Sequence, residues 1–126
     1  MNIALWILQV LLAVAFFAHG MLFLTPPAEL VAQMNASLPR WFQLFLGVAE
    51  VLAAVGLVLP GLTRTATFLV TWAAGGIVIV TISATIWHLA RSEWSSAAIT
   101  LVLLAMASFL AYQRHRVLPI PPRATA

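Results

Sequence analysis

Three ionisable side chains, Glu50, His19 and His88, lie within long apolar stretches of the sequence. Glu50 stands in the segment WFQLFLGVAEVLAAVGLVLPG, and no other charged residue occurs between Arg40 and Arg64. An ionisable group at membrane depth is costly unless it meets a partner or water, so such a residue marks a functional site by default. A carboxylate and an imidazole at that depth are able to exchange protons with a quinol-like or phenolic ligand.

The composition indicates an all-α integral membrane protein. The chain has 126 residues, of which 63% are hydrophobic and 7% are charged. Soluble domains carry about a quarter charged residues, so this chain lacks the polar surface that water requires. We expect a single membrane domain over residues 1–126, with the apolar N-terminal stretch retained because it has no basic start and continues past Ala15.

Two classes of chemistry are excluded by residue content. The chain has no cysteine, which removes disulfides, thiolate nucleophiles and dithiol–quinone exchange. Its net charge of +3 comes from arginines that are scattered between the apolar segments. Because these arginines form no basic stripe, nucleic acid is not an expected partner, whereas the lipid bilayer and other membrane subunits are.

Four segments are long and apolar enough to cross a bilayer, which takes about 20 residues. We predict spans over residues of about 2–24, 41–59, 65–89 and 94–112, with Pro60-Gly61 ending the second span and a Pro-rich irregular tail over 117–126. The short linkers after the second and third spans predict an antiparallel four-helix bundle.

The linker between the first two spans has a helical pattern of its own. Pro26-Pro27 precedes the segment AELVAQMNASL, in which Leu30, Val31, Met34 and Leu38 recur on one helical face. We expect a short interfacial helix here, and a coil packed on the bundle is the alternative.

The arginines predict the orientation. With four spans both termini share one side, together with Arg64, Arg114, Arg116 and Arg123, while the other side holds Arg40 and Arg91. The positive-inside rule therefore places both termini in the cytoplasm and the chain in the cell's inner membrane.

In this topology His19, Glu50 and His88 all fall in the outer half of the bundle. Glu50 lies about 13 Å below the outer surface at 1.5 Å per residue. We predict that Glu50 pairs with His19 in a ligand pocket, with His88 nearer to water. The alternative is a structural carboxylate that bonds Gln43 or nearby hydroxyl groups.

The sequence offers further candidate residues for this pocket and two metal-binding hypotheses. Thr81, Thr85 and His88 share one helical face, which either lines the pocket or binds a neighbouring helix. His19 and His88 also come from two spans at similar depth, as bis-histidine haem ligation requires. Zinc is less expected, because both histidines and Glu50 would have to converge on one point.

The chain resembles the DoxX-like family of small four-span membrane proteins. The resemblance covers nearly the whole chain and rests on the segments LAVAFFAHGMLFLT, GVAEVLAAVGLVLPGLTR, IWHLARSEW and AYQR, with Gly47, Glu50 and Gly56 as the most specific part. Many relatives carry a lysine three residues after the position of Gly20, where this chain has Phe23. We therefore expect His19 to take the place of that lysine beside Glu50.

The resemblance implies a fold more firmly than a function. Different members of the DoxX-like family resemble a subunit of a thiosulfate:quinone oxidoreductase, a component of membrane oxidoreductase assemblies, or a chaperone for receptor assembly. With no complete nucleophile or metal set, we expect a non-catalytic accessory subunit or assembly factor, whose pocket holds a quinone or lipid. The alternative is a subunit of a quinone-linked oxidoreductase in which Glu50 and His19 handle protons.

Overall fold

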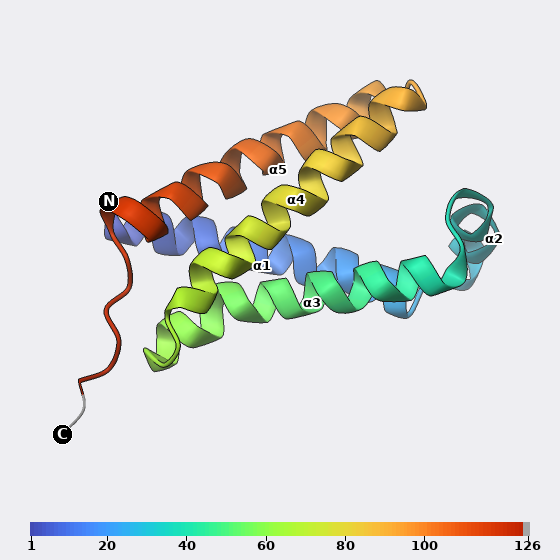
Figure 1. Ribbon diagram of the computed structural model, residues 1–126. Coiled ribbons are helices and arrows are strands. Elements are labelled where there is room, and N and C mark those ends of the chain that lie inside the picture. The colour runs from blue at the N-terminus through green and yellow to red at the C-terminus, as the bar shows by residue number, and fades with distance from the viewer. Residues whose placement is uncertain (125–126) are drawn as a thin grey trace.

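The computed structural model describes residues 1–124, and this part of the chain folds entirely into helices, turns and an irregular tail (Figure 1). The elements in chain order are α1 (Asn2–Leu24), α2 (Ala28–Ser37), α3 (Arg40–Thr63), α4 (Phe68–Ala90), α5 (Trp94–Tyr112) and the π-helical turn η1 (Gln113–Val117). Helices α1, α3, α4 and the segment Trp94–Val117 are each long and apolar enough to cross a membrane.

The four long helices form two antiparallel pairs. Helix α1 packs along α3, α4 packs along α5, and α3 joins the pairs by packing on α4. The pairs lie close together at the end that holds the termini and spread apart toward α2 and the α4–α5 turn (Figure 1). We call these the terminal end and the α2 end.

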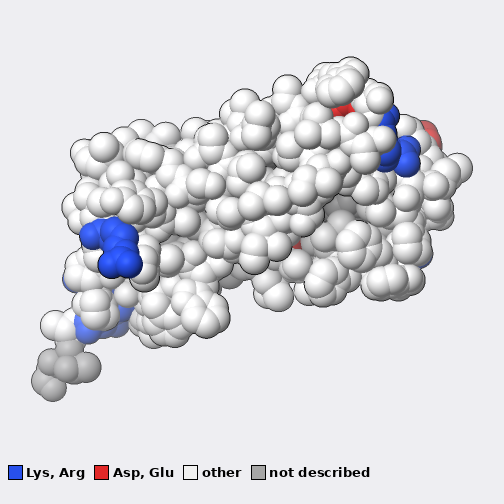
Figure 2. All heavy atoms as spheres, turned by 45° about the horizontal axis from the view of Figure 1, so that its top comes forward, with Lys and Arg blue, Asp and Glu red and all other residues white. Residues whose placement is uncertain are grey.

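The surface fits a bilayer. Basic side chains gather at the two ends of the molecule, and the long surface between them carries almost no charge (Figure 2). Large apolar side chains cover that surface on every long helix, as at Ile7, Leu52, Trp72 and Leu101. These features confirm the predicted all-α, multi-pass membrane bundle.

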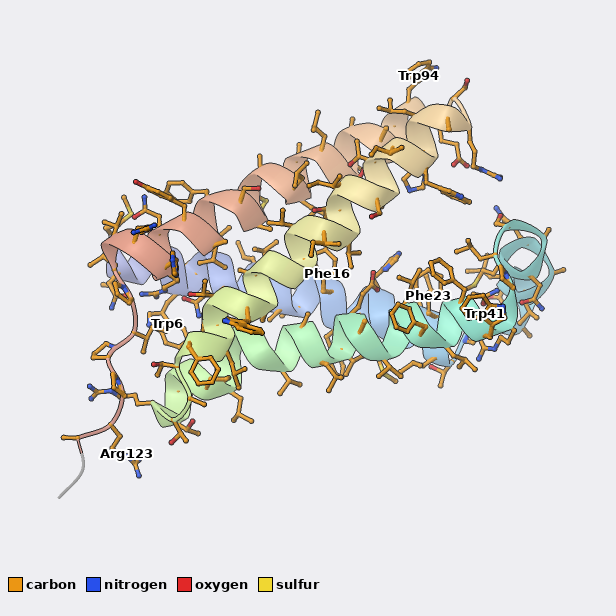
Figure 3. All side chains as sticks on the ribbon, in the orientation of Figure 1. Trp6, Phe16, Phe23, Trp41, Trp94 and Arg123 are labelled. Carbon is orange, nitrogen blue, oxygen red and sulfur yellow. The ribbon has the colours of Figure 1, made fainter. Side chains whose placement is uncertain are left out.

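The apolar core lies in the half of the bundle nearer the termini. It is built by Leu5, Leu12 and Phe16 of α1, Leu57 of α3, Ala74 and Ile77 of α4, and Ala107 and Leu110 of α5. Phe16 lies where the two helix pairs begin to separate (Figure 3). Because the core ends near this level, the α2 half is free to hold a cleft.

Two glycines bring α1 and α3 into close contact in the α2 half. A Cβ atom at Gly47 would lie 2.9 Å from the Gly20 carbonyl oxygen, and one at Gly20 would lie 2.9 Å from the Gly47 carbonyl oxygen. Small residues allow helix backbones to approach this closely inside a membrane, where lipid supplies no hydrophobic drive. This backbone contact fixes the crossing of α1 and α3.

Helix α2 is present where the apolar pattern predicts it, and polar contacts tie it to the bundle. Gln43 of α3 donates to Asn35 Oδ1 of α2 and to the Leu38 carbonyl oxygen, at 2.9 and 2.8 Å. Arg40 donates to the carbonyl oxygens of Phe23 and Leu24. These carbonyls lie at the end of α1, where a helix lacks internal partners for them.

Two predicted boundaries differ from the structure. Helix α3 continues through Pro60-Gly61 to Thr63, because proline removes only one backbone hydrogen bond and membrane helices tolerate that loss. Helix α4 starts at Phe68, since Arg64 and Ala66 adopt left-handed conformations with φ of 55° and 51° that form the turn.

The tail is irregular from Leu118 to the end of the described chain, and residues 125–126 of the predicted tail lie outside it. Arg64 holds this tail against the α3–α4 turn. Its Nε atom donates to the Pro121 carbonyl oxygen at 3.1 Å, and its own carbonyl oxygen accepts from the Arg123 backbone N–H at 2.7 Å.

The glycine crossing gives the first testable prediction. We expect Gly47→Ala to destabilise the protein by about 1–3 kcal/mol, because the added methyl group meets the Gly20 backbone, which cannot move aside alone. Gly75→Ala is the matched control, since a Cβ atom at Gly75 has open space around it. The measurement is the free energy of unfolding in mixed micelles, and equal values for the two variants would contradict the close packing at Gly47.

Candidate functional site

Glu50 and His19 form a hydrogen-bonded pair between α3 and α1. The His19 Nδ1 atom lies 2.7 Å from Glu50 Oε2, so the imidazole N–H donates to the carboxylate. The Glu50 side chain is 4% exposed, whereas the His19 side chain is 53% exposed. The carboxylate thus lies inside the protein, and the imidazole lies between it and the exterior.

The glycine crossing positions this pair. His19 directly precedes Gly20, and Glu50 follows Gly47 by about one helical turn. A Cβ atom at Gly20 would lie 3.2 Å from the Glu50 Cβ atom, so the two backbones are close enough for the side chains to meet. Phe23 holds the imidazole by an edge contact, with ring centroids 4.9 Å apart.

Two cavities meet at the His19–Glu50 pair in the α2 half. One is about 350 Å³ and is bounded by α1, α4 and α5, with Phe16, Thr81, Ser96 and Thr100 in its wall; we call it the α5 cavity. The other is about 400 Å³ and is bounded mainly by α1, α3 and α4, with Phe23, Phe42, Phe45 and Trp87 in its wall; we call it the α3 cavity.

The two cavities share one set of lining residues: His19, Glu50, Val80, Ala84 and His88. Apart from these ionisable side chains the shared wall is apolar. Together the cavities form a cleft between the helix pairs, with a few polar groups in an apolar surround. This distribution is typical of small-molecule sites.

His88 belongs to the cleft and makes a second histidine–carboxylate contact at its rim. Its Nδ1 atom lies 2.9 Å from Glu93 Oε1, and Arg91 Nε lies 3.3 Å from the same oxygen. The hydrogen bond from His88 lowers the pKa of Glu93, and the charge of Arg91 adds to this effect. Glu93 therefore stays ionised and keeps the His88 imidazole in place.

The two threonine candidates have different surroundings. Thr81 lines the α5 cavity, although its hydroxyl donates to the Ile77 carbonyl oxygen at 2.7 Å. Thr85 is not among the lining residues. Its hydroxyl lies 2.7 Å from the Thr81 carbonyl oxygen and 2.8 Å from the Thr100 hydroxyl of α5, so it joins two helices.

The structure corrects one suggested partner of the carboxylate and adds residues that sequence reasoning missed. Gln43 contacts α2 and Arg40 and does not bond Glu50. The aromatic wall of Phe42, Phe45 and Trp87 was not predicted as part of the site. Its signal in the sequence is the one-turn spacing of Phe42 and Phe45, which places both rings on one face of α3.

Both histidines have the orientation that prepares an imidazole for ligand chemistry. In each case Nδ1 donates to a carboxylate, which fixes the tautomer that leaves Nε2 as an acceptor. Nε2 in this form suits either a donor group of a ligand or the iron of a haem, so haem ligation by His19 and His88 stays a prediction. Within residues 1–124, no group of three histidine or acidic residues has the arrangement of a metal-ion site.

The comparisons with known proteins agree with the resemblance found in the sequence. A family model described as the DoxX-like family matches residues 7–110, which include His19, Glu50 and His88. Comparison with curated proteins and with solved structures finds no match. Because the matched region covers most of the sequence and includes parts of all four membrane helices, the chain belongs to the DoxX-like family.

Proposed function

We propose that this protein is a membrane accessory subunit that binds a quinone-class ligand in the cleft between its two helix pairs. The observation that carries the proposal is the His19–Glu50 pair at the junction of two apolar cavities. A quinone has a flat ring with two polar oxygens and an apolar tail. The cleft offers a matching combination of aromatic wall, polar pair and access from the apolar surface.

The polar groups of the cleft match the two redox forms of such a ligand. A quinol hydroxyl donates to the Nε2 atom of His19, whose Nδ1–H is held by Glu50. A quinone carbonyl accepts from the same nitrogen when the imidazole is protonated. The aromatic residues Phe42, Phe45 and Trp87 then supply apolar contact for the ring. A lipid with a polar head meets the same requirements and is the other occupant that we consider.

The accessory role rests on what the described chain contains. It consists of membrane helices with short connections, and its only proton-handling groups at depth are in the cleft. We propose that electron transfer to or from the quinone takes place in another subunit. We propose that this partner is a larger membrane complex and that the protein docks on it through the outer faces of its helices.

A second function is favoured by the hydrogen-bonded pair itself. An imidazole held by a carboxylate is the arrangement of a general base, in which the carboxylate orients the ring and stabilises its protonated form. In a quinone-linked oxidoreductase, His19 would accept the proton of a quinol hydroxyl while a partner subunit accepts the electrons. Glu50 would then act as a positioning residue.

We also propose that the chain lies in the cytoplasmic membrane with both termini inside. The terminal end holds Arg64, Arg116 and Arg123, and no acidic residue lies in its turn, η1 or tail. At the α2 end, Arg91 contacts Glu93 and Glu29 lies in the first turn of α2. The excess of positive charge at the terminal end supports the cytoplasmic location of that end.

Binding of a short-chain ubiquinone to the purified protein tests the ligand. We expect saturable binding, detected as quenching of Trp87 fluorescence that is lost in Trp87→Phe. Glu50→Gln should weaken binding about tenfold or more, because the His19 ring then loses the charged group that orients it. Glu29→Gln is the matched control, since it removes an exposed carboxylate of α2 that lines neither cavity, and it should retain most of the affinity. Equal losses in both variants, or no binding to the wild type, would refute the proposed site.

Purification of the protein from native membranes distinguishes the two functions. For an accessory subunit, we expect a stoichiometric complex whose quinone-linked turnover survives Glu50→Gln. For an oxidoreductase subunit, we expect the complex to stay intact while Glu50→Gln and His19→Gln lower turnover by about a hundredfold, the usual lower bound for a lost general base. A protein that purifies only as itself would contradict both.

A further inference from the structure

Arg114 is buried at the terminal end, on the opposite half of the molecule from the cleft. Its side chain extends from η1 into the space beside α1 and is 3% exposed. The Nε atom donates to Gln9 Oε1 at 2.6 Å, and Nη1 donates to Asn2 Oδ1 at 2.7 Å and to the Leu118 carbonyl oxygen at 2.9 Å. All these acceptors are neutral, so none of them balances the charge of the guanidinium group.

The surrounding residues hold Arg114 in one orientation. Gln9 is itself fully buried and donates from Nε2 to the Leu57 carbonyl oxygen at 2.7 Å, which links the guanidinium group to α3. The ring of Trp6 lies 5.6 Å from the Arg114 Cζ atom. Helix α1 thus holds this arginine directly and α3 holds it through Gln9, as in a built binding site and unlike a surface charge.

One nitrogen of Arg114 remains available. Among the described residues, the buried Nη2 atom has no hydrogen-bond partner. Gln113 Oε1 shares this property, but Gln113 lines neither of the nearby cavities. A buried N–H group of a charged side chain that has no acceptor carries a large desolvation cost. A ligand that supplies the acceptor would remove this cost.

Two cavities adjoin Arg114. One, of about 350 Å³, has Thr67, Thr71 and His115 in its wall, and the other, of about 480 Å³, has Asn2, Trp6 and Arg64. Pro119 and Ile120 of the tail line both cavities, and Arg64 holds that tail in place. Hydroxyl, imidazole and guanidinium groups around a cavity are donors that suit an oxyanion.

The charge of this end favours the same ligand. Arg64, Arg114, Arg116 and Arg123 lie in the α3–α4 turn, η1 and the tail. The three acidic residues of the chain lie elsewhere, in α2, in the middle of α3 and in the α4–α5 turn. An anion that enters these cavities meets Arg64 and Arg114 in their walls, and no carboxylate is among the residues that line them.

We propose that Arg114 and the cavity wall of Thr67 and Thr71 form a binding site for a phosphate-class oxyanion, with Nη2 as the principal donor. Two sources have this chemistry: the headgroup of an anionic phospholipid and a free phosphate. Guanidinium groups bind phosphate oxygens through paired N–H groups, and Nη2 still has both of its own to offer. The site is independent of the cleft ligand, because it lies at the other end of the bundle.

The test measures thermal unfolding of the whole protein under two conditions. Phosphatidylcholine nanodiscs with and without phosphatidylglycerol probe the lipid, and inorganic phosphate titrated against chloride at equal ionic strength probes the free anion. Stabilisation by phosphatidylglycerol alone assigns the site to a lipid headgroup, and stabilisation by phosphate assigns it to a free anion. If neither stabilises the wild type, the proposal is wrong.

Variants separate the site from a general effect of positive charge. Arg114→Gln should weaken the apparent affinity for the stabilising anion about tenfold or more. Arg116→Gln removes the same charge from an exposed position in the same turn, and it should change the apparent affinity for the anion little. Equal effects of the two variants would contradict a specific site. Should Arg114→Gln fail to fold, Thr71→Val decides: weaker anion binding supports the site, and unchanged binding contradicts it.

Discussion

The hydrogen bond between His19 and Glu50 is the interaction on which the functional half of this protein depends. A carboxylate that is 4% exposed among membrane helices needs a donor, and His19 supplies one at 2.7 Å. The contact exists because Gly20 and Gly47 let the backbones of α1 and α3 approach each other without side chains between them. The absence of Cβ atoms at Gly20 and Gly47 thereby determines where the bundle tolerates the Glu50 carboxylate, and with it the place of the proposed ligand contact.

Much of this arrangement follows from the sequence. The ends of α1 and α5 agree with the predicted spans, because hydrophobic length and flanking polar residues decide them locally. The meeting of His19 with Glu50 also follows from span direction and depth, since both residues fall at similar levels on antiparallel helices. The family resemblance added the expectation that His19 replaces a missing lysine beside Glu50, and His19 does contact Glu50.

What sequence reasoning missed depends on side-chain direction and on contacts between distant segments. Arg114 looks like one more arginine after the last span, and only the π-helical turn shows that it points inward to Gln9. Gln43 faces α2 and not Glu50, which residue type alone does not reveal. Thr85 bonds Thr100 of α5, which is one of the two roles that the sequence left open. A helical pattern within α4 does not choose between these roles, because it carries no information about α5.

The bundle thus combines an apolar core in one half with an open cleft in the other, and within residues 1–124 each half contains one buried charged residue, Arg114 or Glu50. The most direct test of the cleft is photo-crosslinking with a quinone that carries a photoreactive group on its ring, followed by peptide mapping. Labels are expected on the segments of α1 around His19, of α3 around Phe45 and of α4 around Ala84, all of which line the cleft. Labels confined to the lipid-facing residues Ile7, Trp72 or Leu101 would show that the cleft does not hold the ring.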